Sequence, residues 1–306
     1  MPEYQLIIIG GGPAGLTAAT YAGRSGLKTL LISTQLGGGL NLAHKVQNFP
    51  GQIEIAGPEL AEKMLAQAKK WSAEIITAEV VDLKKNDDYF VIQTKENKIY
   101  KSQKLLLALG TQKRKLNLPN EEKYIGRGIS YCALCDGHFF KNKNVAVCGS
   151  GDAATTTAIY LSDLAKKVYL IARGENLKCN PDWQKTVQSK KNIDIICGYE
   201  IKELIGQENL TNLRLQNIQG SVQELSISGL FVEIGSMPSS LLAQKIDLEL
   251  DSEGFIKIDQ SGKTSQLNVW AAGDITSGSN KLWQAITAAA EGAIAADSIY
   301  KNFKGN

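Results

Sequence analysis

Several kinds of residue are scarce in this sequence of 306 residues. It has two histidines and five cysteines, and only Cys132 and Cys135 are closely spaced. A structural zinc site usually takes four Cys or His ligands, and a disulfide-stabilised secreted scaffold needs several cysteine pairs. The composition therefore predicts neither a metal site nor a disulfide framework.

Long apolar runs and charge clusters of one sign are also missing. The longest apolar stretch, residues 285–296, is interrupted by Glu291 and is shorter than the roughly 20 residues that span a bilayer. The net charge is +3, and the lysines are scattered instead of being gathered with aromatic residues. The first residues contain no basic segment followed by an apolar one. We therefore expect a cytoplasmic protein that binds neither membranes nor nucleic acid.

The one close cysteine pair, Cys132 and Cys135, has the Cys-x-x-Cys spacing. Such a pair can bind a metal, cross-link a loop or carry electrons. Zinc would need both histidines of the chain as further ligands, and His138 is more typical of a turn or surface histidine. A purely structural disulfide is unusual in the cytoplasm. We therefore favour redox chemistry, with metal binding and a structural cross-link as the alternatives.

Two segments repeat one pattern, IIIGGGPAGLTAATYAGRSGLKTLLIS (residues 7–33) and VAVCGSGDAATTTAIYLSDLAKKVYLIAR (145–173). Each predicts a buried strand, a glycine turn, a helix and a second strand, which is the context of a dinucleotide-binding fingerprint. The glycines allow the backbone to approach a pyrophosphate, which the N–H groups at the helix N-terminus hold. The sequence thus predicts two dinucleotide-binding units, whose turns align Gly10, Gly12 and Gly15 with Gly149, Gly151 and Ala154.

The acidic residue that usually ends the second strand of such a unit is missing from both copies. Ser33 stands at this position in the first copy and Ala172 in the second. The short Ser33 side chain could contact an adenosine ribose. Arg173 follows Ala172, and a cation there suits a 2′-phosphate, which favours NADP over NAD.

A third segment, TSQLNVWAAGDITSGSNKLWQAITAAAEGAIAADSIY (264–300), lies near the end of the sequence. It predicts a short strand over 269–272, a Gly-Asp turn, and an alanine-rich helix over 283–300 that packs closely against another element. From spacing alone, Asp274 is either a turn residue or a cofactor ligand.

Together these motifs resemble the low-molecular-weight flavin-dependent thioredoxin reductases, and the resemblance extends over residues 6–299. Cys-x-x-Cys-Asp-Gly directly before the second fingerprint distinguishes this family from ferredoxin–NADP reductases of similar fold. The matching motifs are GGGPAG (10–15), the glycines at 37–39, NFPG (48–51), GRGISYCALCDG (126–137), GSGDAA (149–154), GLFVEIG (229–235) and AAGD (271–274).

The resemblance implies an α/β fold of two Rossmann-like, three-layer ββα domains, the second inserted into the first. Residues 1–113 and 241–306 would form a discontinuous FAD-binding domain. Residues 114–240 would form an NAD(P)H-binding-like domain that carries the cysteine pair. The resemblance also implies a homodimer.

The resemblance further implies which residues bind the cofactors. Asp274 would accept a hydrogen bond from the FAD ribitol chain, and Gln284 and Ala285 would present backbone to the isoalloxazine ring. The FAD set is Gly10, Gly12, Pro13, Ala14, Gly15, Ser33, Gly37, Gly38, Gly39, Asn48, Gly273, Asp274, Gln284 and Ala285; the NADPH set is Gly149, Gly151, Asp152, Ala153, Ala154, Arg173 and Lys178.

The catalytic residues implied by the resemblance are Cys132, Cys135 and Asp136. The cysteines would take two electrons from the flavin and pass them to the disulfide of a thioredoxin or glutaredoxin-like protein. Cys132 would attack the substrate and Cys135 would face the flavin, while Asp136 would give and accept the proton.

The sequence departs from the family pattern where NADPH-dependent members bind the 2′-phosphate. Their His-Arg-Arg-x-x-x-Arg motif is replaced by residues 172–178, in which Arg173 and Lys178 are the remaining cations. Gly39 and Trp283 replace a glutamine and an arginine, and Glu233 replaces a small residue and would need a partner if buried. We therefore expect poor use of NADPH, with ferredoxin, a reduced flavin or another reductant as alternative donors. The non-enzyme alternative is a dinucleotide-binding redox sensor or scaffold.

Overall fold

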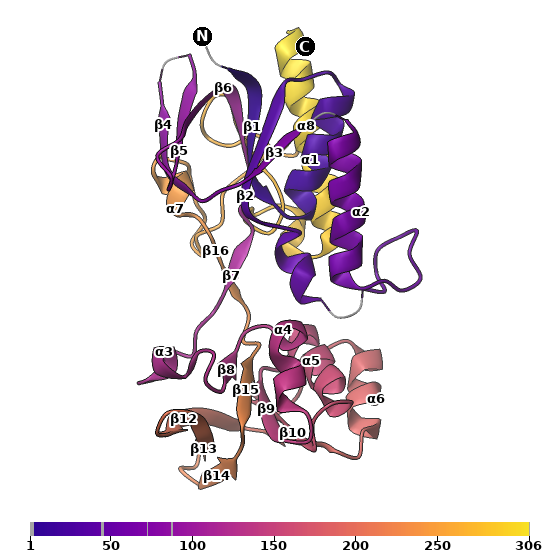
Figure 1. The fold of residues 1–306 in the computed structure, drawn as a ribbon, viewed down its shortest axis with the longest axis vertical. Helices are drawn as coiled ribbons and strands as arrows, with labels where there is room; N and C mark the ends of the chain where they lie inside the picture. Colours follow the sequence, from indigo (N-terminus) through magenta and orange to yellow (C-terminus); the bar gives the residue numbers. More distant parts are fainter. Residues whose placement is uncertain (1–2, 44–45, 72, 87, 306) are drawn as a thin grey trace. The chain divides into compact units, whose positions relative to one another are not determined.

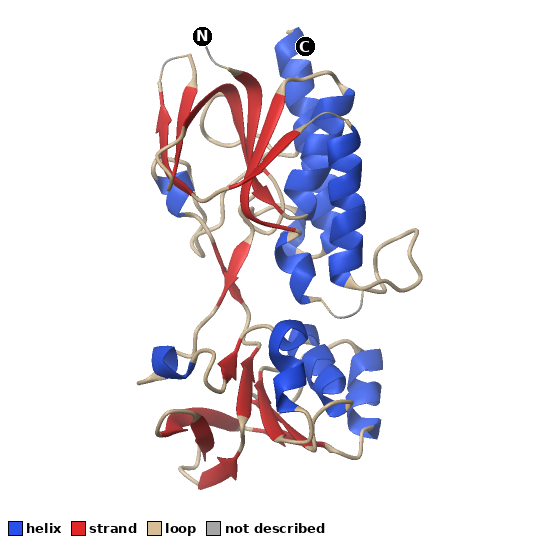
Figure 2. Ribbon diagram, in the orientation of Figure 1, coloured by secondary structure: helices blue, strands red, loops and turns tan. Residues whose placement is uncertain are grey.

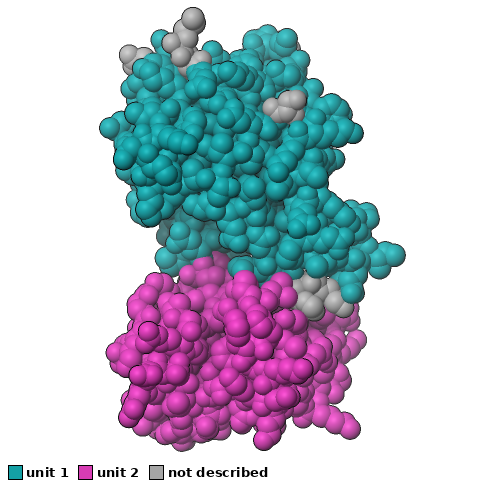
Figure 3. All heavy atoms as spheres, in the orientation of Figure 1, with its two compact units in different colours: residues 1–112, 237–306 teal, residues 113–236 magenta. Residues whose placement is uncertain are grey.

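The computed structural model describes residues 3–43, 46–71, 73–86 and 88–305. The chain divides into two compact units, unit 1 of Met1–Gln112 and Met237–Asn306, and unit 2 of Lys113–Ser236 (Figure 3). Unit 2 therefore interrupts unit 1 in the sequence, with division points between residues 112 and 113 and between residues 236 and 237. Strands β7 (Thr111–Lys113) and β16 (Ser236–Pro238), where the chain passes from one unit to the other, pair with each other.

Unit 1 is built on a seven-stranded sheet. The strand order is β3 (Glu74–Thr77), β2 (Thr29–Leu36), β1 (Tyr4–Gly11), β6 (Ile99–Leu107), β5 (Phe90–Thr94) and β4 (Val80–Lys85). The first four strands in this order are parallel, whereas β5 pairs antiparallel with both β6 and β4. The seventh strand, β17 (Val269–Ala271), pairs in parallel with the second half of β6, beyond the part that pairs with β5.

Both faces of this sheet are covered, and the β1 side chains show how. Leu6 and Ile8 pack in one core together with α1 (Pro13–Arg24), α2 (Gly57–Lys70) and α8 (Ala285–Lys304). Ile7 and Ile9 point to the opposite face, into a second core with β4, β5 and residues 243–275. A strand that is buried on both sides is apolar at every position, which explains its unbroken isoleucine run. Figure 2 shows the three helices along one face of the sheet.

Helix α8 packs closely on α1, as its alanine content predicted. A Cβ atom on Gly292 would lie 2.2 Å from the Ala14 carbonyl oxygen, so this crossing requires glycine. The helix covers Ala285–Lys304 instead of the expected 283–300, because Gln284 caps its first turn together with Thr287. The strand before it ends at Ala271, one residue earlier than expected.

Unit 2 contains a five-stranded, all-parallel sheet and a smaller antiparallel one (Figure 1). The parallel order is β11 (Ile193–Cys197), β10 (Lys167–Ala172), β9 (Asn144–Cys148), β15 (Gly229–Val232) and β8 (Ile129–Ser130). The antiparallel order is β12 (Tyr199–Gly206), β13 (Leu210–Asn217) and β14 (Val222–Ser226). The helices are α3 (Glu121–Tyr124), α4 (Ala133–Asp136), α5 (Asp152–Ser162) and α6 (Pro181–Ser189).

The two units thus have the predicted α/β fold class. Each is a Rossmann-like domain of sheets and helices, and the second is inserted into the first. The remaining short elements are α7 (Leu241–Gln244) and the 3₁₀ turns η1 (Gly38–Leu42), η2 (Gly137–Phe140) and η3 (Ser279–Lys281). Among the helices described, none combines the length and apolar character needed to cross a bilayer.

Candidate redox and dinucleotide sites

The two closely spaced cysteines are joined. Cys132 and Cys135 form a disulfide across α4, with their Cα atoms 5.3 Å apart. Cys132 caps the helix, since its Sγ accepts a hydrogen bond of 3.1 Å from the Cys135 N–H. A donor aimed at this sulfur would stabilise a negative charge on it after reduction. Cys132 is half-buried and Cys135 is exposed.

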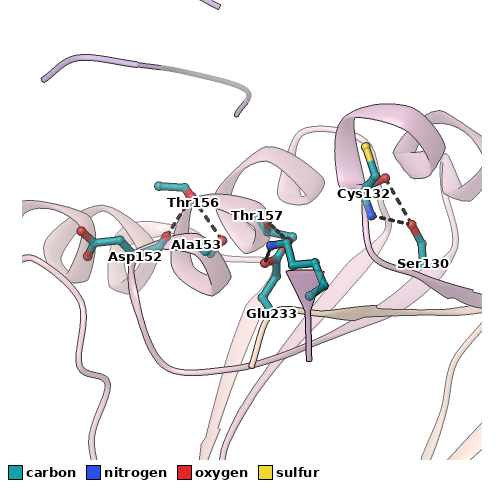
Figure 4. Close-up of polar contacts among 8 residues, drawn as sticks. Ser130, Cys132, Asp152, Ala153, Thr156, Thr157 and Glu233 are labelled. Carbon is teal, nitrogen blue, oxygen red and sulfur yellow. Dashed lines mark hydrogen bonds and ion pairs between the residues drawn. The ribbon is translucent and has the colours of Figure 1, made fainter. Parts of the chain in front are cut away.

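Asp136 is held beside the disulfide by a residue that sequence reasoning missed. Ser130 is buried at the end of β8, and its hydroxyl lies 2.6 Å from Asp136 Oδ2. The Ser130 Oγ atom also accepts a hydrogen bond of 3.0 Å from the Cys132 N–H, as Figure 4 shows. One buried hydroxyl therefore ties the candidate acid to the backbone of the cysteine loop. A serine two residues before a Cys-x-x-Cys motif is the only signal that the sequence offered.

The first fingerprint forms an open helix N-terminus. Helix α1 starts at Pro13, and within the described chain no side chain caps it and its first turn holds no acidic residue. A Cβ atom on Gly15 would lie 1.9 Å from the Gly10 carbonyl oxygen, so helix and strand approach as the fingerprint requires. The free N–H groups and the positive end of the helix dipole fit a pyrophosphate.

The glycines after β2 lie against this turn. Gly37 donates its N–H to the Gly11 carbonyl oxygen at 2.8 Å. Gly38 has φ of +53°, and a Cβ atom there would lie 2.9 Å from the Gly12 Cα. Positive φ and this close approach explain glycine at 37 and 38, whereas a Cβ atom on Gly39 would meet nothing within 4 Å.

Ser33 supports the same turn from within β2, three residues before the strand ends at Leu36. Its buried hydroxyl accepts a hydrogen bond of 2.9 Å from the Gly11 N–H and donates one of 2.9 Å to the Gln35 carbonyl oxygen. The Ser33 hydroxyl proton is thus already donated to Gln35. A hydrogen bond from Ser33 to a ribose would require the bond to Gln35 to break first.

The structure brings two predicted FAD residues together from distant parts of the sequence. Asn48 Nδ2 donates a hydrogen bond of 2.8 Å to Gln284 Oε1, across 236 residues. Gln284 also caps α8, where Ala285 is the first helical residue. Trp283, immediately before, stacks on Phe255 with ring centroids 5.2 Å apart.

Asp274 lies in the turn after β17, and Glu291 of α8 fixes that turn. Glu291 Oε2 accepts hydrogen bonds from the Gly273 N–H at 2.8 Å and the Thr276 hydroxyl at 2.9 Å. Burial, and then the charge of Glu291, raise the pKa of Asp274 to about 6. In the described part of the chain no hydrogen-bond donor reaches the Asp274 carboxyl group. A largely desolvated acceptor without a donor fits the hydroxyl groups of a ribitol chain.

Replacing Asp274 by asparagine is expected to stabilise the FAD-free protein at neutral pH. The pKa of Asp274 is about 6 in the folded protein and 3.8 for an ordinary aspartate. The Asp274 carboxyl group therefore contributes stability below about pH 4, and this contribution is lost as the pH rises through 6. After allowance for partial exposure, the gain in unfolding free energy should be about 1–2 kcal/mol at pH 8 and smaller at pH 5. Thermal denaturation of the apoprotein at both pH values measures it.

The same variant should bind FAD roughly tenfold more weakly, because asparagine is a poorer acceptor than a carboxylate. Titration of apoprotein with FAD measures this loss. An equal stability gain at both pH values, or unchanged FAD affinity, would contradict the assignment of Asp274.

The second fingerprint differs in one respect, because its first helical turn contains Asp152, whose Oδ1 accepts a hydrogen bond of 2.6 Å from the Asn180 N–H. Helix α5 begins at Asp152 after Gly151, and no described side chain caps it. Gly149 has φ of +146°. The Lys178 N–H donates a hydrogen bond of 2.7 Å to the Ser150 carbonyl oxygen, which holds the loop after β10 against the turn.

The side chains around this second turn differ in burial. The Arg173 and Lys178 side chains are exposed, and Ala153 and Ala154 lie in the first turn of α5. The Glu233 side chain, by contrast, is only 8% exposed and forms an ion pair with Lys113. The partner that the sequence required for Glu233 therefore exists.

The histidines make no metal centre with the cysteines in the described residues. His138 is exposed beside Phe139, and His44 lies outside the residues described. No group of three or more His, Cys, Asp and Glu side chains within the described ranges is placed to hold a metal ion. The other cysteines, Cys148, Cys179 and Cys197, are free thiols.

Comparison with known proteins agrees with this arrangement. The sequence profile described as pyridine nucleotide-disulphide oxidoreductase matches residues 4–292. Thioredoxin reductase of Streptomyces coelicolor is 39% identical over 297 residues, which are 95% of this chain and 91% of the relative. Thioredoxin reductase of Bacillus subtilis is 36% identical over 300 residues, 97% and 93% of the two chains.

Two solved structures are similar over nearly the whole chain. Lactococcus lactis thioredoxin reductase, in its FR conformation, has a TM-score of 0.95 at 32% identity and covers 99% of this chain and 100% of its own. Thioredoxin reductase of T. acidophilum has a TM-score of 0.93 at 31% identity and covers 98% of this chain and 99% of its own.

The chain therefore belongs to the pyridine nucleotide-disulphide oxidoreductase family. Within that family it is an oxidoreductase of the low-molecular-weight thioredoxin reductase type, a flavoprotein that uses FAD. The family resemblance and the cofactor predicted from the sequence are thereby confirmed.

Proposed function

We propose that this protein reduces the disulfide of a thioredoxin or glutaredoxin-like protein through Cys132 and Cys135. The observation that carries the proposal is the disulfide between these residues, directly before the second fingerprint. FAD, when bound, supplies the two electrons that reduce this disulfide.

The two cysteines and Asp136 would divide the chemistry between them. The Cys132 thiolate attacks one sulfur of the substrate disulfide, and the other substrate sulfur leaves as a thiolate that takes a proton. Cys135 then attacks Cys132 in the mixed disulfide, which restores the Cys132–Cys135 bond and releases the second substrate thiolate. The hydrogen bond from the Cys135 N–H supports Cys132 as the sulfur that carries charge. Asp136, held by Ser130, gives and accepts the proton.

We propose that unit 1 binds FAD and that unit 2 binds the nucleotide part of an electron donor. The open N-terminus of α1, the glycines of 37–39 and the Asp274 carboxyl group support the first assignment. The N-terminus of α5, which no described side chain caps, supports the second. From the family resemblance we also propose a homodimer that works in the cytoplasm.

NADPH is expected to be a poor electron donor. Only Arg173 and Lys178 remain to hold a 2′-phosphate, and both side chains are exposed. Each lost charge-assisted contact is worth about 1.5–3 kcal/mol, so two lost contacts reduce affinity by roughly two orders of magnitude or more. Position 172 is alanine, so the chain also lacks the acidic residue there that would favour NADH. Reduced ferredoxin or another reductant is then the working donor.

The experiment is anaerobic reduction of the bound flavin, followed by its absorbance, with NADPH, NADH and reduced ferredoxin compared side by side. We expect slow or incomplete bleaching with both nicotinamide nucleotides. Rapid, stoichiometric bleaching by micromolar NADPH would return the protein to the ordinary NADPH-dependent class.

A further inference from the structure

The buried ion pair of unit 2 lies at the point where its strand order reverses. From β9 the chain continues through α5 to β10 on one side, whereas β15 lies on the other side of β9. Ligands of open α/β sheets bind outside the carboxyl ends of the strands at this switch point. Glu233 is the first residue after β15, and its N–H donates a hydrogen bond of 2.8 Å to the Cys148 carbonyl oxygen. Glu233 therefore stands next to the fingerprint turn.

The contact between this residue and the fingerprint is direct. A Cβ atom on Gly149 would lie 2.2 Å from the Glu233 carbonyl oxygen. The Glu233 side chain is only 8% exposed, and its carboxylate pairs with the ammonium group of Lys113. Its other oxygen lies 3.5 Å from the Thr157 hydroxyl of α5, below that helix in Figure 4. A paired carboxylate thus fills the space between β15 and the fingerprint helix.

The two sides of the switch point would take different halves of a dinucleotide. In this fold the residue at the end of the second strand contacts the adenosine ribose, so the adenosine half belongs on the β10 side with Arg173. The nicotinamide half then belongs on the β15 side, where Glu233, Lys113 and Thr157 meet. A nicotinamide ring entering there would have to separate or further desolvate this pair, and its neutral carboxamide group compensates the separated charges less fully than they compensate each other.

We propose that the Lys113–Glu233 pair is a specificity determinant that admits the adenosine and pyrophosphate half of a dinucleotide and rejects the nicotinamide ring. The proposal rests on the assignment of unit 2 as the nucleotide-binding unit. Replacing both partners of such a largely buried pair together leaves no uncompensated charge, so the double exchange for neutral residues is expected to retain the fold.

The test compares two ligands that differ in the nicotinamide part. Isothermal titration of the FAD-loaded protein would use ADP-ribose and the redox-inert 1,4,5,6-tetrahydro-NADH. The unmodified protein should bind ADP-ribose at least as tightly as tetrahydro-NADH. In the Lys113→Ala/Glu233→Ala double variant, tetrahydro-NADH should bind roughly tenfold more tightly, with ADP-ribose unchanged.

Glu233→Gln keeps the volume and removes the charge. A gain of roughly threefold or more in tetrahydro-NADH affinity is expected of it, and it serves alone if the double variant does not fold. The matched control is Glu203→Ala/Arg214→Ala, which removes an exposed ion pair of the same unit and should change neither affinity.

Three results would overturn the proposal. They are unchanged or weaker binding of tetrahydro-NADH by the pair variants, an equal gain for both ligands, and failure of ADP-ribose to bind the unmodified protein. Each is distinct from failure of the proposed disulfide chemistry, which is measured with chemically reduced protein and needs no nicotinamide nucleotide.

Discussion

Replacing either Cys132 or Cys135 with serine is expected to abolish the reduction of a thioredoxin disulfide. The reaction needs one sulfur to form the mixed disulfide and a second to resolve it, and serine provides neither. Both cysteines lie in unit 2, whereas the residues assigned to FAD lie in unit 1, so the variants should retain FAD. Disulfide reduction and the flavin spectrum are measured on the same preparations.

Cys197→Ser is the matched control, because Cys197 is a free thiol of the same unit. It should keep the parent rate. If a serine variant at position 132 or 135 turned over thioredoxin at the parent rate, the dithiol mechanism would be wrong. If it lost FAD, the assignment of the two cofactor regions to separate units would fail.

Asp136→Asn is expected to slow disulfide reduction by about a hundredfold to ten-thousandfold, the range of general acid–base assistance. Asparagine retains the size of the side chain and an oxygen for the Ser130 hydroxyl, so the cysteine loop should keep its structure. It cannot give or accept the proton that the leaving thiolate needs. Steady-state rates over a range of pH measure the loss.

The control for this variant is Asp182→Asn, an exposed carboxylate in the first turn of α6. It should leave the rate unchanged. An Asp136→Asn rate within a few-fold of the parent would show that water or another group handles the proton, and Asp136 would then be a structural residue.

The parts of the fold that the sequence predicted well are those set by short-range constraints. The glycines of both fingerprints are required where strand and helix approach within a few ångströms, so spacing alone located the two turns. The isoleucine run of β1 and the alanines of α8 likewise follow from burial on both faces and from close helix packing. Helix limits were less accurate, because the cap made by Gln284 and Thr287 decides where α8 begins.

What the sequence could not provide are contacts between distant residues. Asn48 with Gln284 and Lys113 with Glu233 are pairs formed only once the sheets are assembled. The sequence did indicate that Glu233 needs a partner, but any of many lysines would have served equally. Ser130 was missed for a different reason, since a serine carries no signal until its hydroxyl is seen beside Asp136.

The central claim, that the Cys132–Cys135 pair transfers electrons to a protein disulfide, does not depend on which donor works in the cell. The direct measurement is a single turnover with protein that has been reduced anaerobically with dithionite and freed of excess reductant. Mixed with oxidised thioredoxin, it should generate at least two thioredoxin thiols per chain and re-form the Cys132–Cys135 disulfide. The Cys132→Ser/Cys135→Ser double variant, reduced in the same way, should generate none. Absence of thioredoxin thiols with the fully reduced parent protein would contradict the account.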